Sequence, residues 1–106
     1  MNLPEVLKDL VNAQNDFDST AFANCFSDTA VAFDEGKTHT GKSAIKTWIE
    51  KATAEYNSKM KPLSFEGDSE KGVLKTEVSG TFPGSPLVLT YHLKFDGKQI
   101  KSLEIN

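Results

Sequence analysis

Apolar residues along the first part of the chain recur with the spacing of α-helices. A first helix is predicted from a stripe spaced by three and four residues: Leu3, Val6, Leu7, Leu10 and Val11. Asn2 would cap this helix, and the polar stretch over residues 12–16 ends its pattern. A shorter second helix would begin at Asp18 or Ser19 and end at residues 27–28. Its predicted apolar face comprises Ala21, Phe22, Cys25 and Phe26.

The middle of the chain predicts a strand, a polar loop and a longer helix. Residues 30–35 alternate weakly, with Val31 and Phe33 on one face and Asp34 on the opposite face with two alanines. The strongest helical pattern of the sequence follows the loop: Ile45, Trp48, Ile49, Ala52 and Tyr56.

From residue 59 onward the apolar period changes from helical to two, which indicates strands. We predict strands over residues 63–67, 73–82, 87–95 and 100–105, separated by turns at 83–86 and 96–97. The third of these strands has the clearest apolar face: Leu87, Leu89, Tyr91, Leu93 and Phe95. The order α-α-β-α-β-β-β-β predicts an α+β fold in which a curved sheet wraps the long third helix.

Length and composition limit the classes to which the protein can belong. The 106 residues, 38% hydrophobic and 25% charged, predict a single globular domain over 1–106. The net charge is −3 and all twelve cations are lysines, so we expect no nucleic-acid partner. No long apolar run is present, so we expect a cytoplasmic protein without a membrane partner. Cys25 is the only cysteine and is interpreted as a core residue.

The polar loop matches a phosphate-binding motif. Residues 36–43, GKTHTGKS, fit the pattern G-x-x-x-x-G-K-[ST] and lie between a predicted strand and a helix, as a P-loop requires. However, nucleotide folds with this motif need parallel strands joined by long crossovers, whereas the later strands here are joined by short turns. Nucleotide binding at Gly36–Ser43 therefore remains only a remote alternative.

Three segments, SDTAVAFDEG, TGKSAIKTWI and LTYHLKFDGKQIKSLEI, together with the order of the elements, resemble the ketosteroid isomerase and SnoaL-like polyketide cyclase family. The resemblance implies the cone-shaped nuclear transport factor 2-like fold, in which helices and a curved mixed sheet enclose an apolar pocket. It also implies a homodimer formed by the outer sheet face, which here bears Val88, Thr90, His92 and Lys94.

The same resemblance assigns candidate catalytic positions. Asp34 matches the general base of the isomerases, and Tyr91 falls where they place a protonated aspartic acid that donates to an oxyanion. Leu10 falls where their second donor, a tyrosine, would be. The chain thus departs from the isomerase pattern at two of three positions.

Independently of the family, an aspartate in an apolar pocket has a raised pKa and can shuttle a proton, and a buried phenol can donate to an enolate oxygen. Asp34 and Tyr91 could instead be a strand cap and a core aromatic, and His39 either a solvated loop residue or part of the pocket mouth. We expect no metal or other cofactor. The candidate ligand-binding residues are Leu10, Phe33, Trp48, Tyr56, Phe82 and Leu89.

These features leave two functions open. The first is a proton-transfer enzyme of the isomerase, cyclase or dehydratase type, acting on a small and largely apolar ligand with Asp34 as base. The second is a non-catalytic ligand-binding or dimerisation module. A cavity lined by Asp34 would favour the first, and a cavity filled by aromatic side chains the second.

Overall fold

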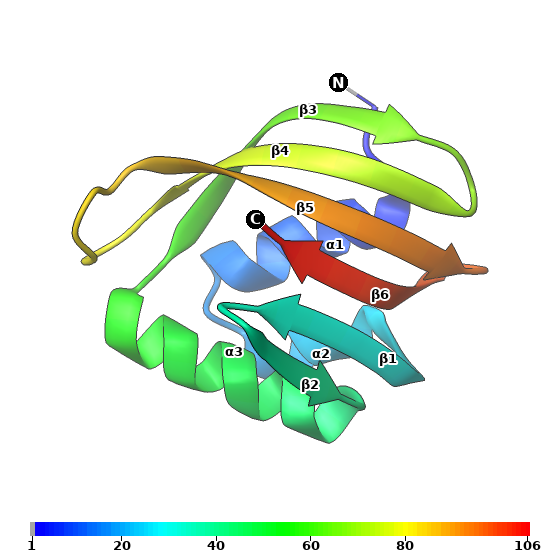
Figure 1. Cartoon of the computed structure of the whole chain (residues 1–106), viewed down its shortest axis with the longest axis horizontal. Helices are drawn as coiled ribbons and strands as arrows, with labels where there is room; N and C mark the ends of the chain where they lie inside the picture. The colour runs from blue at the N-terminus through cyan, green and yellow to red at the C-terminus, as the bar shows by residue number, and fades with distance from the viewer. Residues whose placement is uncertain (1) are drawn as a thin grey trace.

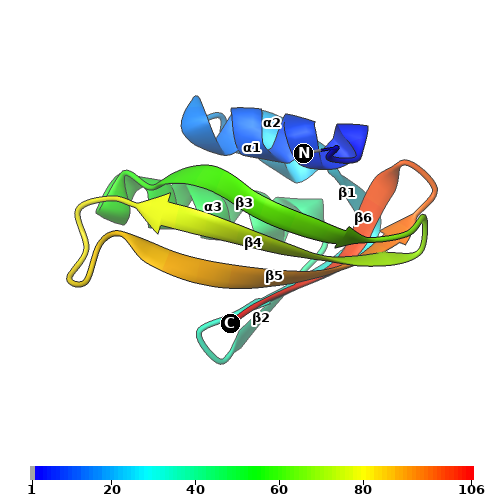
Figure 2. The same cartoon turned by 90° about the horizontal axis from the view of Figure 1, so that it is seen from above.

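A computed structural model describes residues 2–106 as three helices and one six-stranded sheet. The elements are α1 (Glu5–Asn15), α2 (Ser19–Asn24), β1 (Phe26–Asp34), β2 (Lys37–Thr40), α3 (Lys42–Tyr56), β3 (Lys59–Gly67), β4 (Lys71–Ser79), β5 (Leu87–Asp96) and β6 (Gln99–Ile105). The strand order is β2-β1-β6-β5-β4-β3, and the only parallel pair in this sheet is β1 with β6. The helices gather on the inner side of the curved sheet (Figures 1 and 2). The predicted α+β cone is thereby confirmed.

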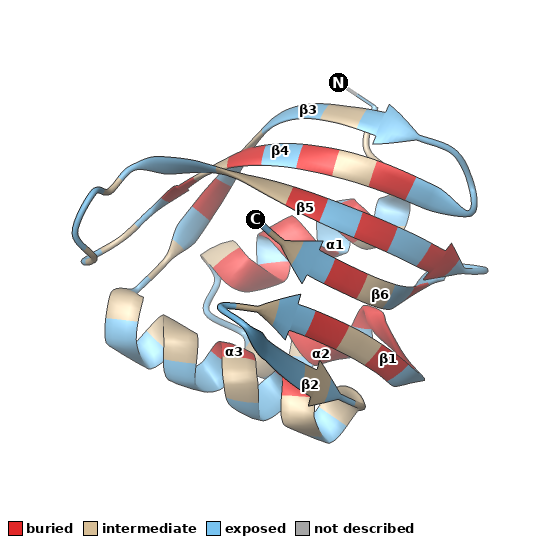
Figure 3. Ribbon diagram, viewed as in Figure 1, coloured by how far each residue is buried: buried red, intermediate tan, exposed pale blue. Residues whose placement is uncertain are grey.

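The core lies between α1, α2 and the inner face of the sheet. Alternate residues of the strands point inward, as the period of two predicts, and they meet the apolar stripes of the helices. The largest fully buried apolar side chains are Leu7, Leu10, Phe26, Ile45, Leu74, Leu93, Ile100 and Leu103. Buried positions concentrate where α1 and α2 cover the sheet, and the ends of β4 and β5 near residues 80–86 are more exposed (Figure 3). One half of the cone is therefore filled and the other half is left open.

The first two helices differ from the prediction at their ends. α1 begins after Pro4, without a cap from Asn2, and continues through the polar residues to Asn15. It continues because the amides of Gln14 and Asn15 bond to the backbone of Ser58 and Met60, so these polar residues have partners. For α2 the predicted start is confirmed: the helix begins at Ser19, and the Asp18 carboxylate caps it by accepting a hydrogen bond from the Ala21 N–H at 3.0 Å.

The second helix is also shorter than predicted. It ends at Asn24, and Phe26 already belongs to β1. Parallel pairing with β6, which matches Phe26 with Ile100, recruits residues 26–29 into the strand. Helical spacing had assigned Phe26 to the helix because an apolar residue at this position fits either pattern.

The P-loop-like segment is a hairpin rather than a phosphate-binding loop. Glu35 and Gly36 form a tight turn with positive φ angles of 53° and 76°, and Lys37–Thr40 forms the unpredicted strand β2 against β1. The second glycine, Gly41, has a φ of 88° and caps α3. The motif lysine, Lys42, lies 3.5 Å from the carboxylate of Asp28. The motif residues thus belong to the turn, to β2 and to the start of α3, and no loop remains to surround a phosphate.

Within residues 2–106, no helix combines the length and the apolar character needed to cross a membrane.

Candidate functional site

A cavity of about 780 Å³ opens into the half of the cone that α1 and α2 leave uncovered. Its apolar walls come from α3 and from the inner faces of the strands: Ile49, Met60, Val78, Leu89 and Ile105. Four aromatic residues also line it, namely Trp48, Tyr56, Phe82 and Tyr91. The aromatic side chains form walls and leave the space between them empty, so the cavity can receive a small organic molecule.

Asp34 enters this cavity from the last position of β1. It lies on the same strand face as the fully buried Ala30 and Ala32, as the alternation predicted, and its own side chain is half-buried. Burial raises the pKa of the Asp34 carboxyl above its usual 3.8, and the neighbouring Glu35 carboxylate adds to this rise. Hydrogen bonds from the Glu35 backbone and from the Trp48 side chain oppose it in part. The carboxyl group therefore holds a proton more tightly than a solvated aspartate does.

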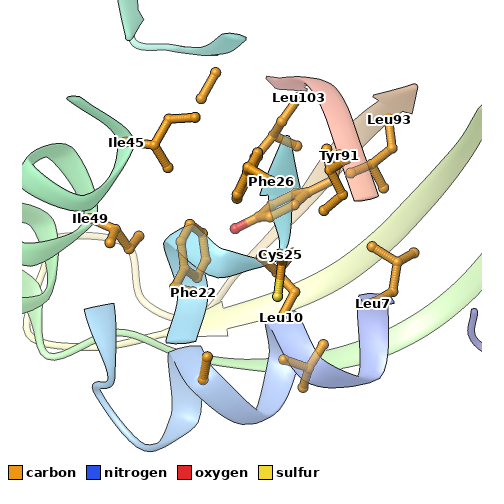
Figure 4. Packing of buried hydrophobic residues seen from close by; sticks show 14 of the residues in the cluster. Leu7, Leu10, Phe22, Cys25, Phe26, Ile45, Ile49, Tyr91, Leu93 and Leu103 are labelled. Carbon is orange, nitrogen blue, oxygen red and sulfur yellow. The ribbon is translucent and has the colours of Figure 1, made fainter. Parts of the chain in front are cut away.

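Tyr91 enters the same cavity from the middle of β5. The residue is 8% exposed, and its hydroxyl is directed away from β5 into the space between sheet and helices (Figure 4). Burial and the nearby Asp34 carboxylate both raise the pKa of the Tyr91 phenol, so it stays protonated at neutral pH. Among residues 2–106 no hydrogen-bond partner of this hydroxyl occurs. The phenol is therefore a donor available to a molecule in the cavity.

Stacked rings form the cavity mouth. His39 stacks on Trp48 with ring centroids 5.3 Å apart and an interplanar angle of 19°. Both residues line the cavity, so His39 belongs to the mouth rather than to a solvated loop. Partial burial and the nearby Lys37 lower the pKa of the His39 imidazole, which favours its neutral form. Tyr56 and Phe82 meet edge to face at 5.9 Å on the rim.

Two predicted ligand-binding residues do not line the cavity. Leu10 is 0% exposed because α1 turns it into the filled half of the cone, beneath the sheet (Figure 4). Phe33 lies on the outer face of β1 and is 39% exposed, since successive residues of a strand point to opposite faces. The other four predicted residues, Trp48, Tyr56, Phe82 and Leu89, line it together with Asp34 and Tyr91.

Sequence reasoning missed several lining residues. Gln14 lies one helical turn after Leu10 on the buried face of α1, a spacing that could have revealed it. Val78 lies within the strand predicted over residues 73–82, where it alternates with the buried Leu74 and Thr76, but the strand pattern did not indicate its position beside the cavity. Met60 lies in the part of β3 that precedes the predicted strand. No local pattern in the sequence distinguishes these cavity residues from core residues.

Other reactive groups lie apart from this cavity. Cys25 is buried beneath α1 and α2, where burial raises the pKa of its thiol to about 11 and where its Sγ lies 3.5 Å from the Ala21 carbonyl oxygen. It borders a smaller hollow of about 430 Å³, which none of the predicted site residues line. In the part of the chain that the structure describes, no three His, Cys, Asp or Glu side chains cluster as metal ligands would.

No protein-family model matches the sequence, and no curated protein does. Among solved structures, a candidate polyketide cyclase from Sinorhizobium meliloti (protein SMa1630) is 35% identical, with a TM-score of 0.93 over 98% of this chain and 95% of that chain. A Catenulispora acidiphila protein with a ketosteroid isomerase-like fold has a TM-score of 0.89 at 19% identity, covering 99% and 86% of the two chains. An NTF2-like protein of Cytophaga hutchinsonii has a TM-score of 0.80 at 12% identity, covering 96% and 86%. The last two show a shared fold alone, whereas the first shares sequence along nearly its whole length.

Proposed function

Because the chain belongs to the SnoaL-like polyketide cyclase and ketosteroid isomerase family, within the nuclear transport factor 2-like superfamily, we propose that its cavity binds a small, largely apolar carbonyl compound. We further propose that the protein moves a proton at the carbon next to that carbonyl group. One observation carries this proposal: Asp34 and Tyr91 reach one cavity from two strands, close enough for the carboxylate to raise the pKa of the phenol. A base and an oxyanion donor are thereby available to one bound molecule.

In this mechanism the Asp34 carboxylate removes a proton from the carbon beside the ligand carbonyl. Electrons of the broken C–H bond move to the carbonyl oxygen, and the Tyr91 hydroxyl donates a hydrogen bond to the resulting enolate. Protonated Asp34 then returns the proton to the same carbon or to another carbon of the conjugated system. The raised pKa of Asp34 favours this mechanism, because it makes the carboxylate a stronger base.

A single oxyanion donor limits the reaction that this site can perform. Leu10, at the position of the second donor in the isomerases, has no polar atom and lies outside the cavity. This observation favours the second candidate function, a module that binds the ligand without transforming it. The open cavity beside Asp34 supports the first, since a binding module needs no half-buried carboxylate there.

Proton exchange on a test ketone distinguishes the two functions. β-Tetralone, an apolar bicyclic ketone, is incubated with the protein in deuterated buffer, and loss of its α-proton signal is followed by NMR. Trp48, the only tryptophan and a cavity residue, reports binding of the ketone independently through its fluorescence. We expect exchange above the buffer rate, reduced about a hundredfold or more in Asp34→Asn and by a similar factor in Tyr91→Phe.

Asp28→Asn is the matched control, because Asp28 is an exposed carboxylate on the same strand. Its exchange rate should equal that of the wild type. Binding without exchange would leave the binding module as the function, whereas exchange that persists in Asp34→Asn would refute Asp34 as the base. Absence of binding for every ketone tested would refute the proposal of a carbonyl ligand.

We also propose that the outer sheet face forms a homodimer. Val88 is 59% exposed on that face, and Phe33 adds a second partly exposed apolar side chain on β1. Burial of these side chains against a second copy would remove apolar surface from water.

A further inference from the structure

Two neighbouring amides, Gln14 and Asn15, tie the end of α1 to the beginning of β3. Asn15 uses both ends of its amide, since Nδ2 donates to the Met60 carbonyl at 3.0 Å and Oδ1 accepts from the Met60 N–H at 2.8 Å. Gln14 donates only from Nε2, to the Ser58 carbonyl oxygen at 2.8 Å. Because this partner is an acceptor, the nitrogen of the Gln14 amide must face it. The orientation of the amide is therefore fixed, and its oxygen points elsewhere.

The Gln14 oxygen is unused by the protein. Within residues 2–106 it accepts no hydrogen bond. Thr76 Oγ1 is the one side-chain polar atom of that range that is shielded from water and also lacks a hydrogen-bond partner. The Gln14 oxygen lacks a partner too, so it must be accessible to water. The residue as a whole is only 7% exposed and lines the 780 Å³ cavity. Of the two hollows described above, Gln14 borders only this one, so a ligand would reach the free acceptor from the cavity.

This acceptor lies apart from Asp34, the proposed base. Gln14 comes from the end of α1, whereas Asp34 comes from the end of β1 at the hairpin with β2. Figure 2 shows α1 and this hairpin on opposite sides of the molecule, with α3 between them. A ligand that fills the cavity would thus meet Asp34 at one part of its skeleton and Gln14 at another.

We infer that Gln14 is a specificity-determining residue, whose Oε1 accepts a hydrogen bond from a hydroxyl or N–H group of the ligand. The inference rests on the proposed function and narrows its ligand class to an apolar carbonyl compound that also carries a donor remote from the carbonyl. A ligand with only carbon or an ether at that place would strip water from Oε1 without replacing its hydrogen bond. Such a ligand would bind more weakly.

The experiment compares matched ligands. β-Tetralone and its benzo-fused tricyclic homologue are each prepared unsubstituted, with one hydroxyl at successive ring positions, and with a methoxy group at the same positions. Affinities are measured from Trp48 fluorescence for the wild type, Gln14→Met and the control Asn15→Ala. Asn15 is the matched control because it anchors the same helix end but does not line the cavity.

For the wild type we expect one hydroxyl isomer to bind about fivefold to tenfold more tightly than the parent ketone and its methoxy counterpart. Gln14→Met should lose this preference and keep the affinity for the parent ketone within about twofold. Asn15→Ala should keep the preference even if its stability falls. The wild-type comparison needs no variant, so the absence of any hydroxyl preference would refute the inference even if Gln14→Met does not fold.

The possible failures are distinct. If the ketones bind but no hydroxyl isomer is preferred, or if the preference survives in Gln14→Met, the role of Gln14 is refuted and the proposed function stands. If no ketone of either series binds, the carbonyl-ligand proposal is refuted, and the inference with it.

Discussion

Thr76 offers a test of how the inner face of the sheet is packed. It lies in the middle of β4 between Leu74 and Val78, and is 0% exposed. Its Oγ1 has no hydrogen-bond partner in residues 2–106. Valine has the shape of threonine and the same branching at Cβ, which suits a strand equally well. Thr76→Val therefore removes a buried hydroxyl with little change in packing.

The expected gain follows from the cost of burying that hydroxyl. In proteins, a buried hydroxyl without a partner costs about 1 to 3 kcal/mol relative to water. The Thr76→Val substitution removes this cost and places a methyl group against apolar neighbours. We expect the free energy of unfolding to rise by about 1 to 2 kcal/mol. For a chain of 106 residues, this corresponds to an increase in Tm of about 5 to 10 °C.

Urea denaturation followed by circular dichroism measures this change, with thermal unfolding as a second readout. Thr38→Val is the matched control, because Thr38 lies in β2 with its side chain exposed to water. That variant should change stability by less than about 0.5 kcal/mol. If Thr76→Val is no more stable than the wild type at an unchanged m-value, the reasoning fails, and the native hydroxyl must be hydrogen-bonded.

Four further outcomes are expected. The folded-state pKa of Asp34 lies above 3.8, so ionising this residue costs stability as pH rises through its unfolded and then its folded pKa. In urea titrations, Asp34→Asn should therefore be as stable as the wild type well below pH 3.8 and more stable at pH 7. A less stable Asp34→Asn at pH 7 would indicate a structural cap instead. In the same assay, Asn15→Ala should lower the free energy of unfolding by about 1 to 3 kcal/mol, because both hydrogen bonds to Met60 are removed. An unchanged free energy of unfolding would show that these bonds do not tie α1 to β3. Calorimetry should detect no binding of millimolar ATP with magnesium, whereas binding abolished by Lys42→Ala would restore the P-loop hypothesis. Light scattering should show that the wild type is a dimer and that Val88→Lys is a monomer. A monomeric wild type at high micromolar concentration would exclude the dimer.

The fold could be predicted because its elements carry strong local patterns. The stripe from Ile45 to Tyr56 and the alternation from Leu87 to Phe95 each fit one secondary structure, and both elements are observed. The secondary-structure prediction was wrong where strand pairing, rather than the local residue pattern, decides the structure. Strand β2 consists of polar residues that have no apolar alternation, and it exists because β1 offers a free edge after the Glu35–Gly36 turn.

The candidate site was partly predictable for a related reason. Asp34 is an isolated carboxylate on a small apolar strand face, which marks it in the sequence itself. Gln14 lies in a polar run that was interpreted as the end of a helix, and only its spacing of four residues from Leu10 distinguished it from Asn12 and Asp16. Its importance arises from contact with Ser58, a residue 44 positions away. Such contacts depend on the assembled fold and have no signature in the local sequence.

The place of Tyr91 on β5 shows how the fold can hold a polar donor without opening its core. The inner-face residues of β5 change from buried to exposed along the strand, in the order Phe95, Leu93, Tyr91, Leu89 and Leu87. Helices α1 and α2 cover the first of these, and the cavity adjoins the last. A phenol at the position of Leu93 would bury its hydroxyl among core side chains, and one at the position of Leu89 would leave its ring partly exposed. Only at the boundary can the ring contribute to the core while the hydroxyl faces the cavity beside Asp34. A regular apolar alternation does not encode this boundary, because it is set by where the helices end.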